Sequence, residues 1–207
     1  MKLSYHHLFR AGSDPESPPL LLLHGTGGDE ESLMPLAHDL SPGSAVLSPR
    51  GDVLENGLPR FFRRFAEGVF DLADVEKRAH GLADFIAAAA GAYGFDPHRL
   101  LAVGYSNGAN IASAALQLRP EALAGAVLLR PMIVLEPESG PDLSRKRILI
   151  SSGDRDPLVP LDHPSQLAAS FRAAGAEVTL KIHPAGHALT GTDRLAAAQF
   201  LMARSKA

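Results

Sequence analysis

A serine held between glycines is the first residue whose setting could support chemistry. Residues 104–108 read Gly-Tyr-Ser-Asn-Gly, which places Ser106 in a G-x-S-x-G pattern. An apolar run at 100–103 precedes the pattern and an alanine-rich stretch follows it, so we expect a strand, a tight turn and a helix. Such a turn would present the hydroxyl of Ser106 as a nucleophile. The competing interpretation is a turn whose serine only caps the helix.

A serine nucleophile needs a base, and the base needs a carboxylate that orients it. Asp154 and Asp156 both follow the apolar run at 148–150. The carboxylates of this segment would lie at the same sheet edge as Ser106. The residues alone leave both aspartates as candidates for the acid, with the other one satisfying backbone N–H groups of the turn.

Two histidines near the end of the chain are candidates for the base. His183 directly follows a predicted strand at 177–182, whereas His187 lies further along a loop that is long enough to reach Ser106. We therefore expect His187 to be the base. The spacing of the two histidines would suit a metal ion only on a helix, and Pro184 and Gly186 argue against a helix. The sequence predicts no metal site.

Small residues near the N-terminus could stabilise an oxyanion. Residues 23–28 read Leu-His-Gly-Thr-Gly-Gly, and glycines let the backbone approach a substrate closely. We expect one backbone N–H from Thr26 and another from Asn107, the residue after the nucleophile. We expect His24 to support this loop by hydrogen bonding. The glycines lack the Gly-Lys-Ser/Thr ending of a phosphate-binding loop.

Alternating apolar runs and helical patterns indicate the elements that position these residues. We expect strands at 20–23, 45–47, 100–103, 126–129, 148–150 and 177–182. We expect helices at 30–40, 73–93, 107–117, 164–174 and 192–203. Continuous apolar strands indicate a sheet covered on both faces. The alternation predicts an α/β fold with a doubly wound, mostly parallel sheet, joined by an antiparallel edge strand at 4–9.

Composition narrows the class of protein. The chain has 207 residues, a net charge of −3 and no cysteine, so a disulfide framework and a cysteine nucleophile are excluded. We expect one domain, residues 1–207, and no nucleic-acid partner, because the chain shows no basic footprint. No apolar run approaches the ~20 residues of a membrane span, and the N-terminus lacks a secretory pattern. We therefore expect a cytoplasmic protein.

The segment at 48–71 is too long for an ordinary connection between elements. It follows a predicted strand, and we expect it to form a wall of the substrate pocket as a lid or a fixed loop. Arg50, Phe61 and Phe62 are its candidate substrate contacts, since pockets combine apolar area with a few polar groups. The alternative places the phenylalanines in the core, since Phe61 and Phe65 are at helical spacing, and pairs the arginines with Asp52, Glu55 or Glu67.

These segments together resemble the α/β-hydrolase superfamily, in its small carboxylesterase and acyl-protein thioesterase-like branch. They are similar to the bacterial phospholipase/carboxylesterase group that includes the MhqD-like hydrolases. The resemblance rests on residues 23–28, 48–51, 58–64, 104–110, 128–132 and 186–187. The run at 153–160 resembles the acid loop of many such enzymes, which implies Asp156 as the acid. The loop at 186–187 resembles their histidine loop, in agreement with His187 as the base.

The resemblance implies a compact α/β-hydrolase fold without a large cap domain, no cofactor, a small-molecule ester substrate and often a homodimer. We therefore predict a serine carboxylesterase that hydrolyses short acyl esters through an acyl-enzyme on Ser106. Thioesterase and lysophospholipase activities are alternatives that use the same three residues. Alternatives of another class are a cofactor-free oxygenase or perhydrolase and a non-catalytic ligand-binding protein of this fold. The sequence does not select the physiological substrate.

Overall fold

The computed structural model describes residues 3–136 and 140–203, and its centre is a sheet with the strand order β1-β3-β2-β8-β9-β10-β11. These strands are β1 (His7–Arg10), β2 (Leu20–Leu23), β3 (Val46–Pro49), β8 (Leu101–Tyr105), β9 (Gly125–Leu129), β10 (Arg147–Gly153) and β11 (Glu177–His183). β1 pairs antiparallel with β3, and the other neighbours pair in parallel. The predicted mostly parallel sheet and its antiparallel edge strand are confirmed.

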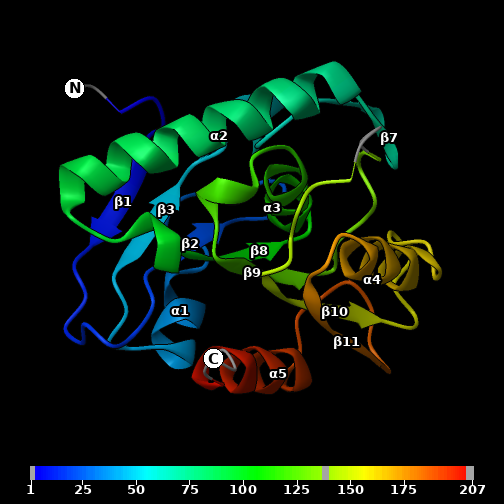
Figure 1. Ribbon diagram of the computed structural model, residues 1–207. Helices are drawn as coiled ribbons and strands as arrows, with labels where there is room; N and C mark the ends of the chain where they lie inside the picture. The colour runs from blue at the N-terminus through cyan, green and yellow to red at the C-terminus, as the bar shows by residue number, and fades with distance from the viewer. Residues whose placement is uncertain (1–2, 137–139, 204–207) are drawn as a thin grey trace.

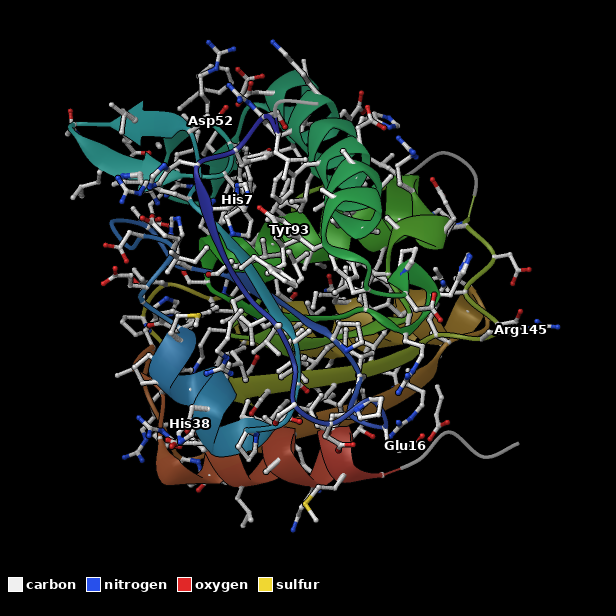
Figure 2. All side chains as sticks on the ribbon, turned by 90° about the vertical axis from the view of Figure 1, so that its left-hand side faces the viewer. His7, Glu16, His38, Asp52, Tyr93 and Arg145 are labelled. Carbon is white, nitrogen blue, oxygen red and sulfur yellow. The ribbon has the colours of Figure 1, made fainter. Side chains whose placement is uncertain are left out.

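Helices cover both faces of this sheet, as Figure 1 shows. They are α1 (Met34–Leu40), α2 (Leu72–Tyr93), α3 (Asn107–Leu118), α4 (His163–Ala173) and α5 (Gly191–Met202), with short 3₁₀ turns η1 (Pro97–Arg99) and η2 (Pro120–Ala122). In Figures 1 and 2, α2 lies on one side of the sheet, and α1 and α5 lie on the other. The arrangement is an α/β-hydrolase fold. Within the described ranges, no helix is both long and apolar enough to cross a membrane.

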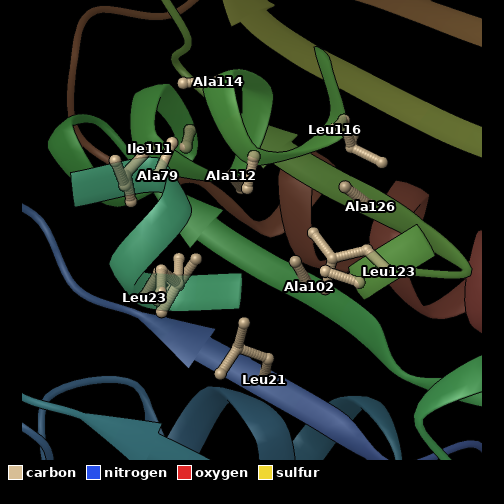
Figure 3. Close-up of a cluster of buried hydrophobic side chains, with 14 of the residues drawn as sticks. Leu21, Leu23, Ala79, Ala102, Ile111, Ala112, Ala114, Leu116, Leu123 and Ala126 are labelled. Atoms are coloured by element: carbon tan, nitrogen blue, oxygen red, sulfur yellow. The ribbon is translucent and has the colours of Figure 1, made fainter. Parts of the chain in front are cut away.

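The alternation of β2 explains why both faces are covered. Its four leucines are almost fully buried, but successive side chains of a strand point to opposite faces. Leu21 and Leu23 join the core beneath α2 and α3, which Figure 3 shows, whereas Leu20 and Leu22 pack with α1 and α5. A continuous apolar run is therefore what a strand between two helical layers requires.

The segment at 48–71 is more ordered than the loop we expected. It contains two hairpins, one of β4 (Val53–Glu55) with β5 (Leu58–Arg60) and one of β6 (Arg64–Ala66) with β7 (Val69–Phe70). Asn56 and Gly57 join the first pair with φ values of 51° and 81°, the conformation that favours an Asn-Gly turn. The helix expected at 30–40 was also too long, since residues 30–33 form turns and α1 begins at Met34.

Candidate active site

Ser106 lies in the turn between β8 and α3, where its backbone has φ 52° and ψ −115°. Non-glycine residues rarely adopt a positive φ, and such strain is often found at functional sites. Two glycines make the turn possible. A Cβ atom on Gly104 would lie 2.6 Å from the Gly108 carbonyl oxygen, and one on Gly108 would lie 1.9 Å from that of Leu23. The strand, turn and helix predicted around Ser106 are thus present.

His187 contacts Ser106 and Asp156 through its two ring nitrogens. Nε2 lies 3.0 Å from Ser106 Oγ, and Nδ1 lies 2.8 Å from Asp156 Oδ2. An ionised carboxylate only accepts hydrogen bonds, so the proton of a neutral imidazole belongs on Nδ1. Nε2 is then free to accept the hydroxyl proton of Ser106. This is the geometry of a serine activated by an oriented base.

The structure distinguishes between the two candidate aspartates. Asp156 has a fully buried side chain, and its Oδ1 accepts the backbone N–H groups of Leu158 and Val159 at 2.9 and 3.2 Å. These bonds leave Oδ2 for His187. The Asp154 side chain is instead half exposed beside Arg155. Asp156 is therefore the aspartate that meets the histidine.

His183 and His187 also occupy different places. His183 is the last residue of β11, and its Nε2 lies 3.1 Å from the carboxylate of Asp193 rather than near Ser106. The longer loop after β11 carries His187 to Ser106, as its length predicted. Across residues 3–136 and 140–203, no cluster of three or more His, Cys, Asp or Glu side chains could hold a metal ion.

The two residues expected to supply backbone donors both lie at the cavity that contains Ser106. Thr26 and Asn107 line this cavity, and Asn107 is the first residue of α3, where a backbone N–H has no partner inside the helix. His24 fixes the loop that leads from β2 to Thr26. Its Nδ1 lies 2.7 Å from the Gly25 carbonyl oxygen, and its Nε2 accepts the Gly51 N–H at 2.9 Å.

The tautomer of His24 follows from these two contacts, since the ring donates from Nδ1 and accepts at Nε2. Burial lowers the pKa of His24, so the ring stays neutral and can accept from Gly51. The expectation that His24 supports the loop by hydrogen bonding is confirmed.

The cavity at Ser106 has a volume of about 280 Å³ and mixed walls. Apolar area comes from Phe70, Met132 and Leu158, and charge comes from Arg60, Arg64 and Glu67, alongside the polar residues already named. Its volume lies just below the range of ~300–1,000 Å³ that ligand pockets commonly span. The cavity therefore suits a short substrate with some polar character.

The expected substrate contacts of the segment at 48–71 require correction. Arg50 does not line the cavity, because its guanidinium forms two hydrogen bonds to the Glu30 carboxylate, at 2.5 and 2.7 Å. Phe61 and Phe62 have no exposed surface. The ring centroids of Phe61 and His24 are 4.7 Å apart, and both Phe61 and Phe62 belong to the core cluster beneath α2 and α3. The alternative interpretation is correct in placing Phe61 in the core and in pairing Arg50 with an acid, but Phe65 is exposed and the partner of Arg50 is Glu30.

Arg60 and Arg64, rather than Arg50, are the arginines that line the cavity. Arg60 is almost fully buried, and its Nη1 donates to the Thr26 hydroxyl at 2.6 Å. Arg64 donates to the Glu55 carboxylate at 2.8–3.1 Å and also to Glu67. Burial lowers the pKa of Arg60. The two hairpins thus bring two arginines to the cavity wall, together with carboxylates of the same segment that pair with Arg64.

Arg130 and Asp193 form a buried ion pair that sequence reasoning missed. Arg130 follows β9 with φ 57° and no exposed surface. Its Nη1 and Nη2 donate to the two Asp193 oxygens at 2.6 and 2.8 Å. Burial raises the pKa of Asp193, but hydrogen bonds from Arg130, Ser151 and Thr190 outweigh this and hold the pKa well below its ordinary value. Only the capping pattern at 190–193, a threonine followed by an acid, marked Asp193 in the sequence.

Comparisons with known proteins agree with this fold. The sequence pattern of the dienelactone hydrolase family matches residues 63–203. A putative hydrolase, MhqD, from Bacillus subtilis (strain 168) is 41% identical over 184 residues, which cover 89% of this chain and 91% of that protein. The Bacillus cereus carboxylesterase has a TM-score of 0.93 at 42% identity, with 96% and 93% of the two chains covered. The structure of YahD with malic acid has a TM-score of 0.88 at 31% identity, covering 95% and 98%.

Proposed function

We propose that this chain, which belongs to the dienelactone hydrolase family, is a serine carboxylesterase acting on short acyl esters. Its family and its carboxylesterase relatives make it a hydrolase. The observation that carries the finer proposal is the hydrogen-bonded series from Asp156 through His187 to Ser106, at 2.8 and 3.0 Å. The series ends in a cavity of about 280 Å³.

The proposed reaction follows from these positions. His187 Nε2 accepts the hydroxyl proton while Ser106 Oγ attacks the ester carbonyl carbon, and Asp156 stabilises the resulting imidazolium. The backbone N–H groups of Thr26 and Asn107 stabilise the oxyanion. When the carbonyl re-forms, His187 protonates the leaving alcohol and an ester of Ser106 remains. Water, activated by the same histidine, then releases the acid and the free serine.

The size and walls of the cavity support small esters with a polar group rather than long acyl chains. Arg60, Arg64 and Glu67 line the cavity and give its wall polar character that matches such a group. The relative YahD has been solved with malic acid, a small polar acid, which supports the same size class for this chain. Thioester hydrolysis uses the same three residues and stays an alternative. The homodimer and the cytoplasmic location stay predictions.

A fluorophosphonate probe together with a panel of acyl esters tests the proposal. We expect labelling at Ser106, the fastest turnover for the shortest acyl chains, and loss of both labelling and hydrolysis in Ser106→Ala. Ser165→Ala removes an exposed hydroxyl of α4 and serves as the matched control. Folded wild-type protein that neither reacts with the probe nor hydrolyses any ester would instead favour a ligand-binding protein of this fold.

A further inference from the structure

We propose that Arg130 is a positioning residue that holds the loop of His187 in register with Ser106. This inference rests on the proposed function, since it assigns Arg130 a part in the reaction of Ser106. Arg130 does not line the cavity, so it acts through His187 rather than by touching the substrate.

The contacts of Arg130 bracket His187 on both sides. Nε donates to the carbonyl oxygen of Gly186 at 2.9 Å, and Nη2 donates to that of Ala188 at 3.1 Å. These carbonyl groups belong to the residues directly before and after His187. A single rigid guanidinium therefore fixes the chain at both ends of the histidine, and with it the direction of the imidazole ring.

The same residue is joined to the other two loops of the site. Its backbone N–H donates to the Ser151 carbonyl of β10 at 2.9 Å, and the carbonyl of the preceding residue, Leu129, accepts the Ser106 N–H at 2.8 Å. Its Nε also lies 4.0 Å from Asp156 Oδ2. Arg130 thus connects the turn of the nucleophile, the acid and the histidine loop.

Asp193 sets the plane of the guanidinium. Both of its oxygens accept from Arg130, and Ser151 Oγ donates to Oδ1 at 2.7 Å. A bidentate pair fixes orientation as well as charge. A lysine could preserve the charge, but its ammonium cannot reproduce the planar fork that reaches Asp193, Gly186 and Ala188 together. The role of Arg130 therefore depends on its shape.

The first test is Arg130→Lys, measured by steady-state hydrolysis of a short acyl ester. We expect kcat to fall on the order of 100-fold, because a displacement of about 1 Å in a reacting group has such an effect. KM should stay within about twofold, because Arg130 itself does not line the cavity. Arg147→Lys is the matched control. Arg147 also donates to two backbone carbonyls, those of Phe200 and Ala203. It is the first residue of β10, at the end of the strand opposite to the site, so the kcat of Arg147→Lys should be unchanged.

The second test separates positioning from folding. The double variant Arg130→Met with Asp193→Leu replaces the buried pair by apolar groups, a change that often leaves stability intact. We expect a cooperative thermal transition with kcat lowered as in Arg130→Lys. The proposal is overturned if either folded variant keeps kcat within about threefold of wild type, or if KM rises as much as kcat falls. If the double variant does not fold, the comparison of Arg130→Lys with Arg147→Lys decides.

The two proposals fail in different ways. If wild-type protein shows no labelling at Ser106 and no ester hydrolysis, the proposed function is wrong. If wild-type protein is active and Arg130→Lys is equally active, the function stands and the role of Arg130 is wrong.

Discussion

Replacement of Gly108 by alanine gives a sharp test of the packing behind Ser106. The new Cβ atom would lie 1.9 Å from the Leu23 carbonyl oxygen and 2.3 Å from its carbon, whereas ordinary contacts begin at 3.4 Å. Both neighbours are backbone atoms of β2, which lies between β3 and β8 in the sheet, so they cannot rotate away as a side chain could. The start of α3 must therefore move outward by about 1.5 Å, the shortfall from an ordinary contact.

This displacement affects both stability and rate. Overpacking a filled core costs about 1–3 kcal/mol, and a chain of this size loses roughly 2–4 °C in Tm per kcal/mol. We expect Gly108→Ala to lower Tm by roughly 2–12 °C. Because Ser106 directly precedes α3, the same movement separates its Oγ from His187. We expect kcat for a short ester to fall on the order of 100-fold.

Gly81→Ala and Gly91→Ala are the matched controls, measured by thermal unfolding and ester hydrolysis on the same preparations. Both glycines lie in α2, and a Cβ atom on either would have no heavy atom within 4 Å. Since alanine favours a helix over glycine by roughly 1 kcal/mol, both variants should be slightly more stable than wild type and fully active. The reasoning is refuted if Gly108→Ala unfolds and reacts like wild type, or if the controls lose as much as Gly108→Ala.

Two further predictions concern carboxylates. Asp156→Asn should lower kcat by about 10⁴-fold, because His187 loses the carboxylate that fixes its tautomer. Asp154→Asn should leave kcat almost unchanged. Steady-state kinetics that rank the two variants the other way would reassign the acid to Asp154. The hydrogen bonds from Arg50 hold the pKa of Glu30 at about 2. Because this is below the unfolded value of about 4.3, ionised Glu30 stabilises the fold above that value, and the contribution is lost as the pH falls towards 2. Glu30→Gln should therefore be less stable than wild type at pH 7, and the stabilities of the two proteins should converge near pH 2. Urea unfolding midpoints measured across this pH range would show the convergence. Parallel midpoint curves for the two proteins would contradict the proposed stabilisation by ionised Glu30.

The sequence predicted those parts of the molecule that depend on local pattern. Continuous apolar runs located the buried strands, because a strand between two helical layers has no polar side. The turn at Ser106 was also predictable, since Gly104 and Gly108 leave few alternatives for so tight a connection. His187 followed from the length of its loop.

Contacts between distant segments were beyond such reasoning. Arg50 directly follows β3, yet its guanidinium binds the Glu30 carboxylate and does not line the cavity, and only the folded arrangement of the two loops shows this. Arg130 and Asp193 are separated by 63 residues along the chain, and no periodic pattern links them. The Asn-Gly pair at 56–57 is typical of a hairpin turn, but it does not indicate which side chains of the hairpin lie near Ser106.

The pairing of Arg130 with Asp193 has a consequence for biosynthesis. Ser106, β8 and α3 leave the ribosome well before His187 and the helix that begins at Gly191. The hydroxyl of Ser106 is thus made before the proposed proton acceptor, His187, and before Asp193, the anchor of Arg130. The proposed mechanism therefore predicts that a probe labels Ser106 only after α5 has docked, so labelling would report the docking of α5.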